Sequence, residues 1–191
     1  MEKVLMVVLA LVAVIALSLG VGMRISQTTM QGFQTTIQGL LTAPKIKVDL
    51  CVDFKPANGE WQHVGCTDLL TDAGKNHLKG ILGGTITTNL HTKYIAIGNG
   101  TEPTASSTVL DSEQTDCGLA RVLGDYYDLG TGNWEVNTTF TYTCSVQRVI
   151  NTTAAFNQAS GGTLFAGGAI PTVTLAVAGD QIRVRHIYTV S

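Results

Sequence analysis

Apolar and polar residues alternate strictly from Ile46 to Phe54, and this pattern constrains the fold more than any other feature of the sequence. Successive side chains of a β-strand point to opposite faces of a sheet, so a period of two indicates a strand with one buried face. A second alternating stretch begins at Asn133 and ends at Gln147. Charged residues make up only 14% of the chain, and glycine is abundant. This composition is typical of an all-β protein.

The dipeptide Asn58-Gly59 follows the first alternating stretch and predicts a hairpin with a type I′ turn. If these two residues form the loop, positions whose numbers sum to 117 face each other across the hairpin. Cys51 then lies directly opposite Cys66. We therefore predict a disulfide between these two cysteines.

The remaining cysteines are Cys117 and Cys144. Cys144 shares the apolar face of its alternating stretch with Trp134, Val136, Phe140, Tyr142 and Val146, which places it on the core side and leaves Cys117 as its partner. Free buried thiols and a metal site are the alternatives. The sequence has no C-x-x-C motif, and the cysteine spacings match no common zinc ribbon. We expect no metal site and no cofactor.

An apolar, uncharged run of twenty residues extends from Val4 to Met23. As a helix it would be ~30 Å long, which matches the thickness of a bilayer core. A retained anchor, a cleaved signal peptide and a buried core helix are the three interpretations. Between Gln27 and Leu41 a helical apolar stripe continues as a stalk or as a self-association face. Residues 1–42 are thus expected to be a membrane or assembly helix with its stalk, and residues 43–191 a separate domain.

The short stretch that contains Leu70, Ala73, Leu78, Ile81 and Leu82 predicts one amphipathic helix that ends at Gly83-Gly84. Many short strands with frequent turns follow it, and the last two strands are expected to form a hairpin around Gly179. The predicted fold is mainly β: an antiparallel β-sandwich or jelly-roll-like domain with a long N-terminal hydrophobic helix and one short helix.

Three sequons, which begin at Asn99, Asn137 and Asn151, are possible N-glycosylation sites. Together with the cysteines they favour a location of residues 25–191 outside the cell membrane, either at a cell or virion surface or after secretion. The net charge of −2 excludes a nucleic-acid binder that works through a basic surface.

Residues that could carry chemistry are few. His186 lies on the apolar register of the last strand, where a packed core histidine is favoured over a ligand. The segment from Asp125 to Asp128 reads as a solvated turn rather than a Ca²⁺ loop. Tyr126 and Tyr127, with Trp134 nearby, form either an exposed aromatic patch or part of the packed core. No catalytic motif is found, and we do not expect an enzyme.

A series of short motifs from about residue 67 to residue 191 resembles tailed-phage and prophage structural proteins of the tail-fibre or tail-associated kind. The motifs are TDLLTDAGKNHLKGILGG, YIAIGNGTEP, TASSTVLDSE, GGTLFA and AGDQ, in this order. In those proteins a T-x-A-G helix precedes a glycine-rich strand end, an ALxxE segment, SGGTLFAR and AGDTL. The resemblance implies a β-sandwich and a structural role, without catalysis.

Two functions are compatible with these features of the sequence. The first is a structural surface protein that assembles with copies of itself in a virion or an extracellular filament. Its apolar run from Val4 to Met23 would enter a lipid bilayer or the hydrophobic core of the assembly. In this case the strand from Ile46 to Phe54 is a candidate for donation to a neighbouring subunit. The second is a membrane-anchored or secreted adhesin that binds surface glycans.

Overall fold

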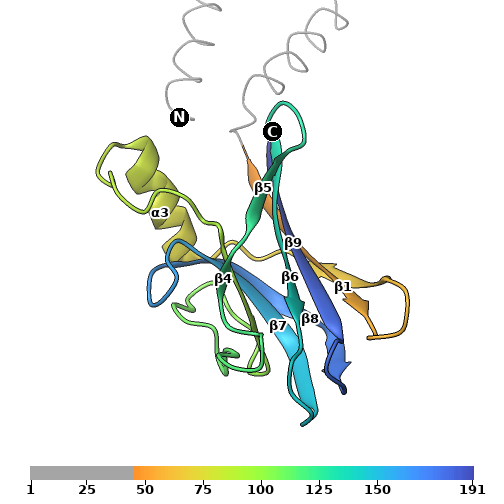
Figure 1. The fold of residues 1–191 in the computed structure, drawn as a ribbon. Coiled ribbons are helices and arrows are strands. Elements are labelled where there is room, and N and C mark those ends of the chain that lie inside the picture. Colours follow the sequence, from red (N-terminus) through yellow and green to blue (C-terminus); the bar gives the residue numbers. More distant parts are fainter. Residues whose placement is uncertain (1–44) are drawn as a thin grey trace, which may run out of the picture. The chain divides into compact units, whose positions relative to one another are not determined.

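The computed structural model of this protein describes residues 45–191, whose fold is shown in Figure 1. The described chain forms two antiparallel sheets, with strand orders β2-β1-β9-β6-β5 and β4-β3-β7-β8, and one helix, which confirms the mainly β prediction. This arrangement is consistent with a β-sandwich. The elements are β1 (Ile46–Lys55), β2 (Gln62–Thr67), α3 (Asp72–Leu82), β3 (Tyr94–Gly98), β4 (Val122–Leu123), β5 (Asp125–Asp128), β6 (Asn133–Thr141), β7 (Arg148–Phe156), β8 (Leu164–Leu175) and β9 (Gln181–Val190).

The predicted N-terminal helix and stalk lie outside the described residues. Within residues 45–191, α3 is too short and too polar to span a bilayer.

The larger of the two hydrophobic clusters in residues 45–191 holds side chains from both sheets. The alternation that begins at Ile46 places Val48, Leu50 and Val52 on the buried face of β1, where none is more than 2% exposed. Burying each such side chain stabilises the fold by ~1.5–3 kcal/mol before entropic costs. The other large core side chains include Ile95, Ile97, Phe140, Ile150, Phe165, Leu175, Ile182, Val184 and Tyr188.

The β1–β2 hairpin turns one residue earlier than predicted. The Gly59 N–H donates to the Pro56 carbonyl at 3.0 Å, and neither Asn58 nor Gly59 has the positive φ of a type I′ turn. A Cβ added at Gly59 would lie 3.1 Å from the Pro56 ring, so this turn leaves little room for a side chain at position 59. A register shift after Val52 then restores the predicted alignment of the two cysteines.

The predicted hairpin between the last two strands is wrong, because β8 pairs with β7 while β9 lies between β1 and β6. The turn at Gly179 is present, but it carries the chain from one sheet to the other. Asp180 holds this crossing in place, because its carboxylate accepts hydrogen bonds from the N–H groups of Ala57, Ala176 and Val177 at 2.7–3.1 Å. Burial raises the pKa of Asp180, but these three donors outweigh it and hold the pKa below its usual value.

Two of the four sheet edges cover each other. A side chain at Gly65 of β2 would meet the ring of Pro171 in β8, and Leu70 pairs with Ala166 just beyond. The strand considered for donation, β1, lies between β2 and β9 and pairs with both within its own chain. Figure 1 shows the opposite side, where β4 and β5 follow one another directly.

Candidate functional site

The segment from Val122 to Leu129 forms the remaining edge of both sheets, and we call it the open edge. Its first part, β4, pairs with β3, and its second part, β5, pairs with β6. Gly124 joins the two parts where an added Cβ would lie 2.7 Å from Val136. The residues between 45 and 191 supply no strand to the outer side of β5.

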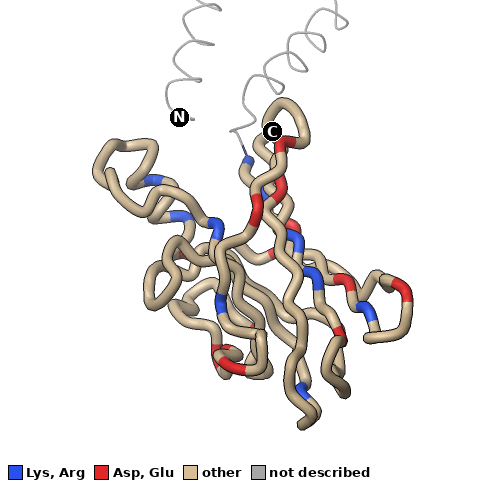
Figure 2. Tube along the Cα trace, viewed as in Figure 1, with Lys and Arg blue, Asp and Glu red and all other residues tan. Residues whose placement is uncertain are grey.

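Large apolar and aromatic side chains gather along this edge. Five of the eleven large hydrophobic side chains that are exposed within residues 45–191 belong to it, at 39–52% exposure. Edge strands are ordinarily protected by a short length, by charged side chains and lysine above all, by proline or by a covering loop; β5 is short, with 4 residues, but it has neither lysine nor proline. Its charged residues are both acidic (Figure 2). The five residues are Val122, Leu123, Tyr126, Tyr127 and Leu129.

The backbone of β5 presents hydrogen-bonding groups outward at every second residue. The Leu129 N–H donates to the Asn133 carbonyl at 3.1 Å, which marks this pair as one that bonds toward β6. Because the pattern alternates in an antiparallel ladder, Tyr127 also bonds toward β6, whereas Tyr126 and Asp128 direct their N–H and C=O groups away from it.

A cavity of about 230 Å³ lies beside this edge. Its wall includes Leu78 and Ile81 of α3, Tyr126 of β5 and Trp134 of β6. Lys93 also lines it and lies over the ring of Tyr126, with its Nζ 5.2 Å from the ring centroid. Each of the two alternatives for these aromatic residues holds in part: Tyr126 is exposed and lines the cavity, Trp134 lines it but also packs against the core, and Tyr127 is exposed away from it.

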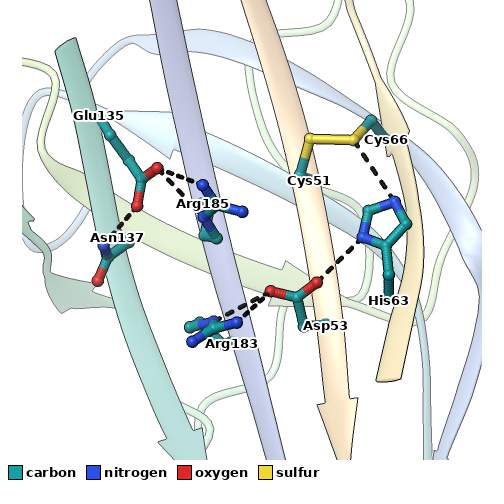
Figure 3. A network of polar contacts seen from close by, with 8 residues as sticks. All are labelled: Cys51, Asp53, His63, Cys66, Glu135, Asn137, Arg183 and Arg185. Carbon is teal, nitrogen blue, oxygen red and sulfur yellow. Dashed lines mark hydrogen bonds and ion pairs between the residues drawn. A yellow bond between two sulfur atoms is a disulfide. The ribbon is translucent and has the colours of Figure 1, made fainter. Parts of the chain in front are cut away.

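A second feature is a network of ion pairs on β1, β6 and β9, shown in Figure 3. Asp53, 5% exposed, accepts two hydrogen bonds from Arg183, at 2.8 and 3.0 Å, and lies 3.0 Å from Nδ1 of His63. Arg183 also lies 4.7 Å from the ring centroid of Trp61.

The second ion pair of this network joins the neighbouring strands β6 and β9. Glu135, 6% exposed, accepts two hydrogen bonds from Arg185, at 2.7 and 3.1 Å, and one from the Asn137 amide at 2.5 Å. Burial raises the pKa of Asp53 and of Glu135, but the bonded partners outweigh it and hold both pKa values below their usual range. Both carboxylates are thus committed to holding strands together, and the network is structural.

Both predicted disulfides are present, Cys51–Cys66 and Cys117–Cys144. The first links β2 to β1, and the second links the loop before β4 to the segment after β6. Val146 was expected on the core side, and this expectation is wrong, because its side chain is 67% exposed. β6 ends at Thr141, so the alternating residues that follow it do not belong to this strand.

The segment from Asp125 to Asp128, expected to be a turn, is strand β5. Its two carboxylates are three residues apart, so they point to opposite faces of the sheet. Among residues 45–191 no three His, Cys, Asp or Glu side chains are grouped closely enough to hold a metal ion.

The three sequon asparagines lie in different surroundings. Asn99 is exposed in the turn after β3, Asn137 belongs to the ion-pair network, and Asn151 lies on β7 with its amide donating to the Gly100 carbonyl.

The open edge was not predicted from the sequence, because the outer partners of a strand depend on the order of strands in the sheet. The signal available in the sequence was the concentration of apolar and aromatic residues, without lysine, between Val122 and Leu129.

No protein-family model matches this sequence, and no curated protein matches it either. The resemblance to tailed-phage structural proteins therefore stays a prediction.

Proposed function

We propose that this protein is a non-catalytic structural subunit that assembles with copies of itself outside the cell membrane, in a virion or an extracellular filament. Its domain would be a β-sandwich of jelly-roll-like character, carried by a segment from Val4 to Met23 that enters lipid or the core of the assembly. The observation that carries the proposal is the open edge, where unpaired backbone groups and apolar side chains occur together.

An open edge of this kind favours association through an added strand. Unpaired N–H and C=O groups on a strand are a template for another chain, and proteins that stay monomeric normally block them. Here the side chains next to those groups include Tyr126 and Leu129. Their removal from water by a partner would favour association.

The backbone pattern of the open edge is compatible with a second copy of the same edge in antiparallel orientation. Facing residues of an antiparallel pair either both bond across the shared side or both bond away from it, and in β5 the residues that bond outward are Tyr126 and Asp128. Tyr126 of one copy would therefore face Tyr126 or Asp128 of the other, and Asp125 would never face Asp128. In the register that pairs Tyr126 with Asp128, Tyr127 faces its own counterpart, a cross-strand aromatic pair that contributes ~0.2–1 kcal/mol.

The disulfides support the extracellular part of the proposal. Disulfides persist in oxidising compartments and are rare in the reducing cytosol. Both bridges hold edge or loop segments rather than a cluster of reactive groups, which is typical of structural disulfides.

The proposal is tested by Tyr126→Pro in the full-length protein, with Tyr126→Thr as its matched control. Both variants lose the ring, but only proline removes the outward N–H, and the bonds to β6 are untouched because Tyr126 does not bond toward β6. We expect Tyr126→Pro to weaken self-association about tenfold more than Tyr126→Thr, measured by analytical ultracentrifugation. Equal association of both variants and the unmodified protein would show that copies do not meet at this edge.

A glycan-binding adhesin is the second candidate, and the cavity beside the open edge favours it. Aromatic faces bind sugars, and Trp134 lines the cavity. One face of Trp134, however, is stacked on Tyr188 at 5.0 Å between ring centroids, which leaves only its other face for a ligand. Binding of the full-length protein on a glycan array, lost in Trp134→Leu, would support this function.

A further inference from the structure

The three sequons differ in what their side-chain amides already do. An N-linked glycan replaces one hydrogen of the asparagine amide with a bulky sugar chain, so the amide must reach solvent without breaking native contacts. Burial and hydrogen bonding of each amide therefore decide which sequon can carry a glycan in the folded protein.

Asn137 is committed to the ion-pair network. Its amide donates to Glu135 at 2.5 Å, and Glu135 is held in turn by Arg185. A sugar on this nitrogen would leave it a single N–H and would have to fit beside the buried Glu135 carboxylate and the Arg185 side chain on the neighbouring strand.

Asn151 is also committed. Its amide donates to the Gly100 carbonyl at 3.2 Å, and its Oδ1 is buried without a hydrogen-bond partner among the described residues. A glycan there would have to pull a partly buried amide out of the surface of β7. The contact with Gly100 also places Asn151 directly beside the first sequon, so one glycan would crowd a second.

Asn99 has the opposite character. It is exposed in the turn that follows β3, and its side chain forms no hydrogen bond with any residue from 45 to 191. Only its backbone is fixed, because its N–H donates to the Ser112 carbonyl at 3.2 Å. The sequon threonine, Thr101, is exposed as well, and its backbone N–H is held by Asp111 at 2.9 Å. The turn is thus rigid while both sequon side chains are free.

We propose that Asn99 carries an N-linked glycan and that Asn137 and Asn151 do not. The donor is a sugar chain on a lipid pyrophosphate. A new bond joins the Asn99 amide nitrogen to the anomeric carbon, the bond from that carbon to the phosphate oxygen breaks, and the lipid pyrophosphate leaves as the amide loses a proton. The proposal rests on the extracellular location in the proposed function.

A glycan at Asn99 leaves the open edge free. β3 pairs with β4 through Tyr94 and Ile95, at the end of the strand that is remote from Asn99. The sugar chain therefore covers one end of the domain while copies can still meet at β5.

Trypsin separates the three sequons, which makes the test direct. Cleavage after Lys93, Arg121, Arg148 and Arg183 gives three consecutive peptides with one sequon each. The peptides with Asn99 and Asn137 are joined by Cys117–Cys144, so the protein from its native source is analysed by mass spectrometry before and after reduction.

We expect a glycan mass on the peptide from 94 to 121 alone. The mass should disappear in Asn99→Gln and in Thr101→Ala, and it should remain in Thr101→Ser, which keeps the sequon, and in the control Asn151→Gln. The proposal is overturned if all three peptides have their sequence masses, if the glycan is on Asn137 or Asn151, or if the added mass survives Asn99→Gln because it sits on a serine or threonine. Free thiols in the unreduced sample would contradict the extracellular location itself, whereas intact disulfides without a glycan would contradict only the assignment of Asn99.

Discussion

His186 is enclosed on the buried face of β9 and is 0% exposed. Its register partners are Leu50 of β1 and Val136 of β6, neither of which is ionisable. Nε2 lies 3.4 Å from the hydroxyl of Thr153, while Nδ1 has no hydrogen-bond partner among the described residues. Burial without a charged partner lowers the pKa of His186 to about 3.

This histidine should make folding stability depend on pH in mildly acidic solution. Because its pKa is lower in the folded than in the unfolded protein, the unfolded chain binds the proton first as pH falls below about 6.5. The free energy of unfolding should therefore drop by roughly 2 kcal/mol between pH 6.5 and 4.5. In His186→Leu this drop should largely vanish, as measured by urea unfolding at both pH values.

Between pH 6.5 and pH 4.5 the three buried carboxylates should contribute little to the change in stability. Asp53, Glu135 and Asp180 have lowered pKa values, so the stability that they contribute is present at higher pH and is lost mainly below about pH 4.5. An equal loss of stability in His186→Leu and the unmodified protein would show that His186 is not the responsible group.

The core position of His186 could be predicted from the sequence, because a period of two assigns its face without knowledge of its partners. The role of Asp180 could not be. Its three N–H donors come from two separate turns, and Ala57 is 123 positions away in the chain. Contacts between distant turns depend on how the sheets are arranged, and no pattern in the neighbouring sequence predicts them.

Helix α3 ends where its sequence indicates, and Leu78 packs against the core as expected, but Leu70 lies before the helix and pairs with Ala166 of β8. Thr71 caps the first turn by accepting a hydrogen bond from the Gly74 N–H, and Gly83 ends the helix. Leu82, expected on the apolar face, is 81% exposed. The close contact is made by Gly74, whose missing side chain lets the helix approach β8.

We therefore expect Gly74→Ala to destabilise the protein by about 2 kcal/mol or more, although alanine is the better helix former. The reason is that an added Cβ would lie 2.1 Å from the carbonyl oxygen of Phe165, a backbone atom that cannot move aside cheaply. Thermal unfolding followed by circular dichroism measures the effect.

Gly80→Ala is the matched control in the same helix. The nearest atoms that its added Cβ would meet belong to side chains and not to the backbone, namely Cδ1 and Cγ1 of Ile86 and, at 3.3 Å, Oγ1 of Thr85, and the Ile86 side chain can change rotamer. We expect its stability to lie within about 1 kcal/mol of the unmodified protein. Similar losses in both variants would mean that the approach of α3 to β8 is not what requires glycine at position 74.

Strand identity was predictable, and strand partnership was not. The alternation located β1, β6 and β9, and the cysteine register of the first hairpin was confirmed even though its turn was misplaced. The sequence placed β8 and β9 in one hairpin, because a short turn joins them. The protein instead uses that turn to pass between sheets, a choice fixed by the pairing of β9 with β1 and β6.

The described domain is closed on one side and open on the other. β2, β8 and the segment around Leu70 cover each other, and the Cys51–Cys66 bridge holds β2 in this position. Cys117–Cys144 ties down the loop that leads into the open edge. In the chain-entropy account each bridge stabilises the domain by ~3–4 kcal/mol. The open edge therefore belongs to a domain that two disulfides hold together.

Self-assembly outside the membrane is the central claim, and the segment from Val4 to Met23 tests it most directly. We expect this segment to enter lipid or the interior of an assembly, because twenty uncharged and largely apolar residues would form a large apolar patch in water. A charge in the middle of such a segment costs ~2.5–3.5 kcal/mol in lipid, and a buried unpaired charge in a packed core costs a comparable amount.

The measurement is electron microscopy, together with cell fractionation, of the full-length protein as Val12→Asp, with Val12→Leu as the control. We predict that Val12→Asp releases the protein from membranes or abolishes ordered assemblies, whereas Val12→Leu behaves as the unmodified protein. Both variants should keep the β-sheet circular dichroism spectrum. If Val12→Asp leaves association and localisation unchanged, the segment neither anchors nor assembles the protein, and the structural-subunit account is contradicted.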